Sequence, residues 1–123
     1  MTRVLLCAAL LLAAQTAHAS DPWRTQDVVL EGLYQTALIA DWKQTRLIAK
    51  NPAHYREGTS SGLFGSYPSV SDVNRLFVVG SLLHVATVHW LPAEYRTAFQ
   101  SVGVTMEMYC IRRNLRIGLN VTF

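Results

Sequence analysis

The stretch Ile39–Pro52, "IADWKQTRLIAKNP", decides how the first helix of this chain packs. At about 100° per residue, Asp41 falls near the middle of the helix face that carries the apolar side chains, with Gln44 and Thr45 beside it. An unpaired charge costs free energy when it is buried, so Asp41 must be paired, hydrogen-bonded or protonated. The apolar members of this face are Leu30, Leu33, Tyr34, Ala37, Leu38 and Ile48.

Outward from this stretch, the periodicity predicts helices over residues 28–50, 72–91 and 93–114. The first ends before Pro52, because the residue before a proline leaves the helical region. Ser71 is expected to cap the second helix, and Pro92 suits the first turn of the third. Residues 53–71, rich in glycine and serine, read as a loop. The predicted fold is all-α: a three-helix bundle, or a helical hairpin plus one helix.

The C-terminal segment 116–123, "RIGLNVTF", alternates apolar and polar residues and predicts a short β-strand or an extended tail. One hypothesis docks this tail on the sheet edge of a partner protein. The alternative packs the tail against the helices of its own chain. The residues of the hypothetical docking tail are Arg116, Ile117, Leu119, Val121 and Phe123.

Residues 1–19 have the order of a secretory signal peptide: a basic start, an apolar run from Val4 to Ala14, and small residues up to Ala19. Cleavage after Ala19 would leave residues 20–123 as one small domain. Cleavage would also remove Arg3, which leaves ten basic and eight acidic residues. Because this excess of positive charge is small, we expect no nucleic-acid partner. Cys110 is then the one cysteine that remains, and we expect a buried apolar thiol.

The second helix carries no charge from Leu76 to Leu91, which fits either a buried core helix or a membrane span. Sixteen residues reach only about 24 Å, less than the roughly 30 Å of a bilayer core. The loop charges nevertheless favour the inner membrane over the soluble periplasm. If three spans were present, Arg24 and Arg96 would lie outside. The basic residues inside would be Lys50, Arg56, Arg75, Arg112, Arg113 and Arg116.

Polar side chains on the three helices suggest a shared site. Gln100 and Glu107 recur about every seventh residue with Gly103 and Asn114, and Arg96 lies on the same side. If the faces converge, Asp41, His84 and Glu107 could form a structural polar network, an ion or proton site, or a catalytic pocket. The expected members of the site are Asp41, Gln44, Thr45, His84, Gln100 and Glu107.

No motif specifies an activity for these residues. The chain lacks an HExxH metal motif, paired cysteines, a phosphate-loop lysine and a GxSxG elbow. We therefore expect no cofactor and no catalytic residue, and no particular metal is predicted.

Several short motifs occur in a recognisable order: D-W-K-Q-T, P-S, V-N, L-P-A-E-Y-R and I-G. Over residues 38–123 this set resembles a family of small helical envelope or membrane proteins of proteobacteria and their phages. The resemblance implies a helical fold and an envelope location, and no activity carries over. The family pattern has a loop acid before Asn-Pro. Alignment on Gly65 places Thr59 at that acid, with Glu57 two positions early, which implies that the acid is lost.

These observations favour a non-enzymatic envelope protein that is embedded in or associated with the membrane. It would act by binding another envelope or phage component, and it could form homo-oligomers. The alternative is a membrane enzyme, or a polar site that handles a metal ion or protons through Asp41, His84 and Glu107.

Overall fold

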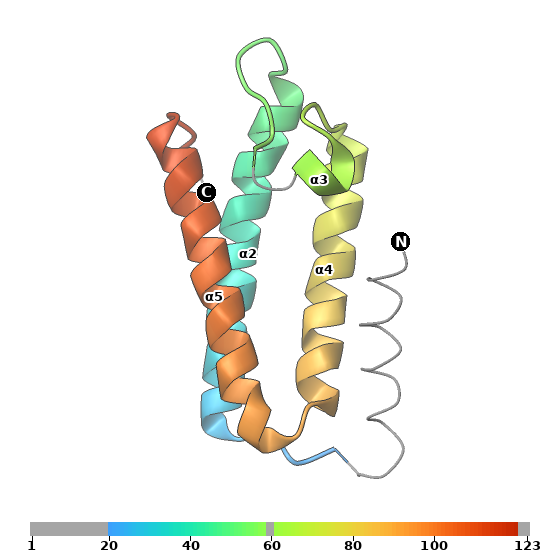
Figure 1. The fold of residues 1–123 in the computed structure, drawn as a ribbon, viewed down its shortest axis with the longest axis vertical. Coiled ribbons are helices and arrows are strands. Elements are labelled where there is room, and N and C mark those ends of the chain that lie inside the picture. Colours follow the sequence, from blue (N-terminus) through green and yellow to red (C-terminus); the bar gives the residue numbers. More distant parts are fainter. Residues whose placement is uncertain (1–19, 59–60, 121–123) are drawn as a thin grey trace.

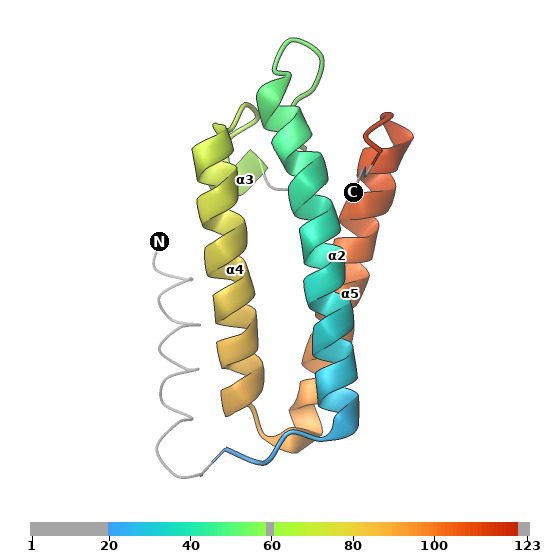
Figure 2. The same ribbon diagram turned by 180° about the vertical axis from the view of Figure 1, so that it is seen from behind.

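A computed structural model describes residues 20–58 and 61–120 of the chain, and the predicted all-α fold is confirmed there. Three long helices, α2 (Thr25–Lys50), α4 (Val70–Trp90) and α5 (Ala93–Arg116), lie side by side, and the short α3 (Ser61–Phe64) lies near the start of α4 (Figure 1). Helix α2 packs against both α5 and α4, whereas α4 and α5 touch each other little. Figure 2 shows this arrangement from behind, with α2 in front of α5.

The second long helix begins two residues earlier than predicted. Its N-cap is Ser69 rather than Ser71, and the helix starts at Val70. The Ser69 hydroxyl accepts a hydrogen bond from the backbone N–H of Asp72 at 3.1 Å and donates to the Asp72 carboxylate at 2.6 Å. The prediction of Ser71 was wrong because Ser69 and Asp72 form a reciprocal cap that Ser71 cannot make with the residue three positions on.

The third long helix extends to Arg116, two residues beyond its predicted end. No strand follows within the described residues up to 120; a turn at Gly118, with φ of +88°, reverses the chain. The backbone N–H of Leu119 donates to the carbonyl of Asn114 at 3.1 Å, and the Leu119 side chain is buried. The described part of the tail therefore packs on its own helices. Outside the described residues lie two members of the hypothetical docking tail, Val121 and Phe123.

The polarity of the bundle is inverted relative to that of an ordinary globular domain. Among the residues that the structure describes, seven hydrophobic side chains are buried, against ten polar or charged ones. The buried polar residues are Asp27, Glu31, Asp41, Gln44, Thr45, Glu57, His84, Arg96, Gln100 and Asn114. Many large apolar side chains lie on the outside instead. Polar contacts along α2 therefore hold the helices together at least as much as apolar packing does.

No helix within residues 20–58 and 61–120 combines the length and the apolarity that a bilayer-crossing segment needs.

Arg96 on α5 ties together one end of the bundle. It is fully buried and lies 3.6 Å from the carboxylate of Asp27, the residue that helps to cap α2. Asp27 also accepts from Arg24 at 2.8 Å, and the hydrogen bond from the Arg24 side chain lowers the pKa of Asp27 to about 2. The Arg96 guanidinium donates to four backbone carbonyls, those of Asp21, Pro22, His89 and Leu91. One side chain thus joins α2, α4, α5 and the N-terminal segment.

The same N-terminal segment caps α5. The carboxylate of Asp21 accepts the backbone N–H of Ala93 at 2.8 Å, at the positive end of the helix. Pro92 itself is the N-cap residue and makes no side-chain cap, so the prediction that it opens the first turn is off by one residue. Capping of α5 therefore depends on a residue more than seventy positions earlier in the chain.

We predict that Arg96→Met destabilises the protein by about 3 kcal/mol or more, because four carbonyls and a buried carboxylate lose a charged donor. Urea unfolding of the full chain, followed by circular dichroism, measures the change. Arg112→Met is the matched control, since Arg112 is exposed on the same helix; its effect should stay within about 0.5 kcal/mol. Equal effects of the two substitutions would contradict the role of Arg96.

Candidate functional site

Besides the Arg96–Asp27 pair, buried and half-buried polar residues form two clusters along the interior of the bundle. The histidine cluster consists of Glu31, Tyr34, His84 and Gln100, contributed by α2, α4 and α5. The carboxyl cluster consists of Asp41, Gln44, Glu57, Glu107 and Asn114, contributed by α2, α5 and the loop after α2. Each cluster draws on three segments, so each fixes how those segments meet.

In the histidine cluster, His84 is held by a hydrogen bond to Glu31 and by ring stacking. Its Nδ1 lies 3.0 Å from the Glu31 carboxylate, and its ring stacks on Tyr34 with the ring centroids 3.5 Å apart. Gln100 donates from Nε2 to the same carboxylate at 3.2 Å and to the backbone carbonyl of Asp27 at 2.8 Å. Burial lowers the pKa of His84, and the Glu31 carboxylate opposes this effect. Glu31 is therefore the acceptor that joins α2 to both other long helices.

Gly103 on α5 closes the other side of the imidazole. A Cβ atom at this position would lie 2.9 Å from His84 Nε2 and 3.0 Å from Tyr34 Cδ2. His84 Nε2 is buried and has no hydrogen-bond partner among the described residues. The ring nitrogen thus faces the backbone of α5 at close range, which leaves His84 a packing role.

In the carboxyl cluster, a chain of amide hydrogen bonds fastens the end of α5 to α2. Asn114 donates from Nδ2 to Asp41 Oδ1 at 2.8 Å and to Gln44 Oε1 at 3.3 Å. Gln44 in turn donates from Nε2 to the carbonyl of Leu119 at 2.9 Å. Asp41 is therefore hydrogen-bonded on the inward face of the helix, where it is the acceptor for Asn114.

Two carboxyl groups in this cluster, those of Asp41 and Glu107, retain protons at unusually high pH. Burial raises the pKa of Asp41 to about 7, with further contributions from the charges of Glu107 and Glu57, while the hydrogen bond from Asn114 lowers it. Burial also raises the pKa of Glu107 to about 7. Glu107 Oε2 is buried without a hydrogen-bond partner in the described part of the chain. Asp41 and Glu107 therefore change protonation near neutral pH.

The sequence predicted that Asp41, His84 and Glu107 could converge on one site. In the structure His84 belongs to the histidine cluster, whereas Asp41 and Glu107 belong to the carboxyl cluster. His84 pairs with Glu31, whereas Asp41 interacts with Asn114 and Glu107. Gln44, Gln100 and Thr45 are buried as expected. Over residues 20–58 and 61–120, no group of three or more histidine, cysteine, aspartate or glutamate side chains is placed to hold a metal ion.

Three acids that were not predicted to belong to the site are buried: Asp27, Glu31 and Glu57. Asp27 and Glu31 are spaced by four residues and share the face of Tyr34, whereas Leu33, which was expected on this face, is 53% exposed. The buried face of α2 is thus rotated by about one residue from the predicted face. The helical spacing of Asp27, Glu31, Tyr34 and Asp41 was a signal in the sequence that could have indicated this rotation.

Glu57 shows that a loop carboxylate reaches the interior. The Glu57 side chain is only 6% exposed, and its charge acts on Asp41. The backbone N–H of Glu57 donates to the carbonyl of Ser66 at 2.7 Å, which closes the loop around it. Thr59, where the resemblance places the loop acid, lies outside the described residues, so the loss of that acid stays a prediction.

No protein-family model, curated protein or solved structure matches this chain. The resemblance to small envelope proteins stays a prediction, and function has to be argued from the chemistry of the described residues.

We predict that stability falls as the pH rises from about 4 to about 7 and then levels off. The pKa values of Asp41 and Glu107 rise from 3.8 and 4.5 to about 7 on folding, so ionisation favours the unfolded chain. Asp27, with its pKa lowered to about 2, acts oppositely below about pH 4, and His84, whose pKa burial lowers, partly offsets the fall as the pH approaches the ordinary histidine value. Urea unfolding across this pH range measures both effects.

Two variants and a control assign the pH effect to the carboxyl pair. Asp41→Asn and Glu107→Gln should each flatten the slope between pH 4 and 7, while Asp41→Asn still accepts the hydrogen bond from Asn114. Glu94→Gln, at an exposed position of α5, should leave the slope unchanged. A double variant that retains the full slope would show that other groups cause it.

We predict that Gly103→Ala destabilises the bundle by about 1–3 kcal/mol, because the added methyl group overlaps the buried rings of His84 and Tyr34. Gly32→Ala on α2 is the matched control, because nothing lies within 4 Å of a Cβ atom there. It should be neutral or stabilising by up to about 1 kcal/mol, as expected for alanine in an open helix position. Thermal unfolding of both variants checks the difference, and equal effects would refute close packing at Gly103.

Proposed function

We propose that this chain is a non-enzymatic protein of the cell envelope whose apolar outer surface lies against membrane lipid. The inverted polarity of the bundle is the observation that carries this proposal. Large apolar side chains on the outside of α4 and α5 are more than half exposed, among them Val78, Leu82, Leu83, Trp90, Val102, Met106 and Met108.

Physical chemistry favours an apolar environment for this surface. Removing one large aliphatic side chain from water contributes about 1.5–3 kcal/mol, and extended exposed apolar patches mark interaction surfaces. In lipid, polar groups have to satisfy one another inside the protein, as Glu31 does with His84 and as Asp41 does with Asn114. Contact of this kind needs an apolar face and does not need a helix that crosses the bilayer.

A structural role for the polar clusters supports a protein without catalysis. The Glu31 carboxylate and the side-chain NH2 groups of Gln100 and Asn114 form hydrogen bonds with other helices of the same chain. We further propose that the protein acts by binding another envelope component. At the C-terminal end of α5, Arg116 and Ile117 are exposed beside the buried Leu119, so within the described part of the tail they are accessible to a partner.

We predict that the full chain with a C-terminal tag sediments with membranes and resists a carbonate wash. Replacing two exposed leucines of α4, by Leu82→Ser and Leu83→Ser, should shift the protein to the soluble fraction without loss of helix content. Thr105→Ser is the control, because serine keeps the hydrogen bond from the side-chain hydroxyl to the carbonyl of Ser101. Immunoblotting of the fractions measures the distribution. Release of the unaltered protein by carbonate would overturn membrane-lipid contact.

A second candidate function is reversible proton binding. The buried and unpartnered Glu107 Oε2, beside Asp41 with its pKa near 7, favours this alternative. The pH series described for Asp41→Asn and Glu107→Gln tests it. A proton site requires that the slope in stability disappear in the double variant.

A further inference from the structure

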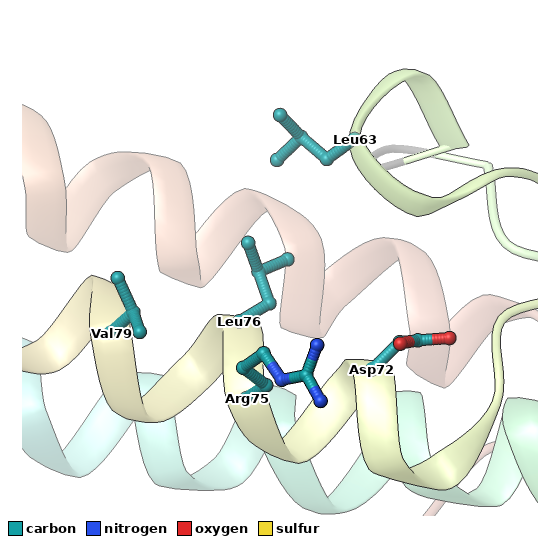
Figure 3. A pocket seen from close by; sticks show the side chains of 5 residues that line it. All are labelled: Leu63, Asp72, Arg75, Leu76 and Val79. Carbon is teal, nitrogen blue, oxygen red and sulfur yellow. The ribbon is translucent and has the colours of Figure 1, made fainter.

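A pocket between α3 and α4 combines an apolar lining with one basic side chain. Its walls come from Leu63 on α3 and from Asp72, Arg75, Leu76 and Val79 on α4. Figure 3 shows Leu63 on the far side of the opening from Leu76, with the Arg75 guanidinium between Leu76 and Asp72. The pocket thus places a cation next to three aliphatic side chains.

Arg75 is the group in this pocket that is open to a ligand. It is exposed and makes no hydrogen bond or ion pair with any other residue in the ranges 20–58 and 61–120. The one acid in the lining, Asp72, is engaged in the helix cap, where its carboxylate accepts from Ser69 Oγ at 2.6 Å. A guanidinium of this kind suits a phosphate group, to which it can donate two parallel hydrogen bonds.

The apolar part of the pocket continues along α4. Val79 lies one helical turn from Leu82 and Leu83, which are 66% and 62% exposed. A ligand with its phosphate at Arg75 could therefore extend a hydrocarbon chain past Leu76 and Val79 onto the apolar side of the helix.

The charge distribution at this end of the bundle points to the same ligand. Figure 1 shows that α2 and α5 finish at the end of the bundle where α4 begins. Exposed basic residues belong to the ends of α2 and α5, the loop after α2 and the start of α4. They are Lys50, Arg56, Arg75, Arg112, Arg113 and Arg116. The opposite end carries the exposed acids Asp21 and Glu94, while its two arginines, Arg24 and Arg96, pair with Asp27. Basic residues beside an apolar surface favour anionic lipid headgroups.

We propose that the pocket between α3 and α4 binds an anionic phospholipid, with its phosphate on Arg75 and an acyl chain over Leu63, Leu76 and Val79. This inference deepens the proposed membrane association and rests on it. It assigns a ligand class to one site, in addition to general contact with lipid.

The test titrates the full chain, purified in a mild non-ionic detergent, with short-chain phosphatidylglycerol and separately with short-chain phosphatidylcholine. Tryptophan fluorescence and thermal stabilisation report binding. We expect phosphatidylglycerol to bind at least about tenfold more tightly, and Arg75→Ala to abolish this preference. Arg112→Ala is the matched control: it removes an exposed charge from the same end of the bundle but outside the pocket, and should change the affinity less than about fivefold.

A further variant and a competitor without an acyl chain test the proposed contact of the acyl chain with the pocket. Leu76→Ser should weaken phosphatidylglycerol binding, and glycerol phosphate, which has no acyl chain, should compete poorly. If glycerol phosphate competes as well as the lipid does, the pocket is a phosphate site and the phospholipid proposal fails. If Arg75→Ala and Arg112→Ala weaken binding equally, the attraction comes from the whole basic end and the pocket proposal also fails.

The outcomes also separate this inference from the proposed function. Equal binding of the two lipids would overturn recognition of the anionic headgroup, while carbonate-resistant sedimentation of the same protein would leave membrane association in place. Loss of both lipid binding and sedimentation would overturn the two proposals together. Binding to a second copy of the chain at this face, detected as a dimer that the lipid does not dissociate, would replace lipid as the occupant.

Discussion

The bundle depends on the burial of Arg96 against Asp27. A guanidinium removed from water needs a nearly complete set of acceptors, and the chain supplies four carbonyls and one carboxylate from separate segments. This requirement brings the N-terminal segment over the junction of α4 and α5 and sets the axial position of α2 against α5. Gln100, one turn further along α5, then reaches the carbonyl of Asp27 and the carboxylate of Glu31.

Because polar side chains occupy much of the interior, many large apolar side chains lie on the outside of the bundle. On α4 the buried side chains are Val73, His84 and Val88, and the rest of this helix, which carries no charge beyond Arg75, is half-buried or exposed. The arrangement suits surroundings of low polarity, where hydrogen bonds between helices gain strength and an apolar exterior is no penalty. The same surface adjoins a basic end, and these two properties together underlie the proposed association with lipid and the proposed phospholipid site.

The carboxyl cluster makes the other end of the bundle responsive to protonation. Asp41 is the acceptor for Asn114, and through Gln44 the same hydrogen bonds hold Leu119 against α2. Glu107 and Glu57 bring further negative charge to this position, so ionisation of Asp41 works against the packing that it supports. The packing of the loop after α2, of the end of α5 and of the C-terminal turn therefore depends on one buried acid, Asp41.

The sequence by itself determined the three long helices, the inward position of Asp41 and the shared face of Arg96, Gln100 and Asn114, because periodicity and helix breakers are local properties of the chain. Only the tertiary structure decided which polar groups meet. His84 pairs with Glu31, and Glu57 enters from a loop, because pairing depends on how each helix is rotated and shifted against its neighbours. A rotation of one residue placed Leu33 outside and Glu31 inside, which a periodic pattern with apolar residues on several faces does not specify.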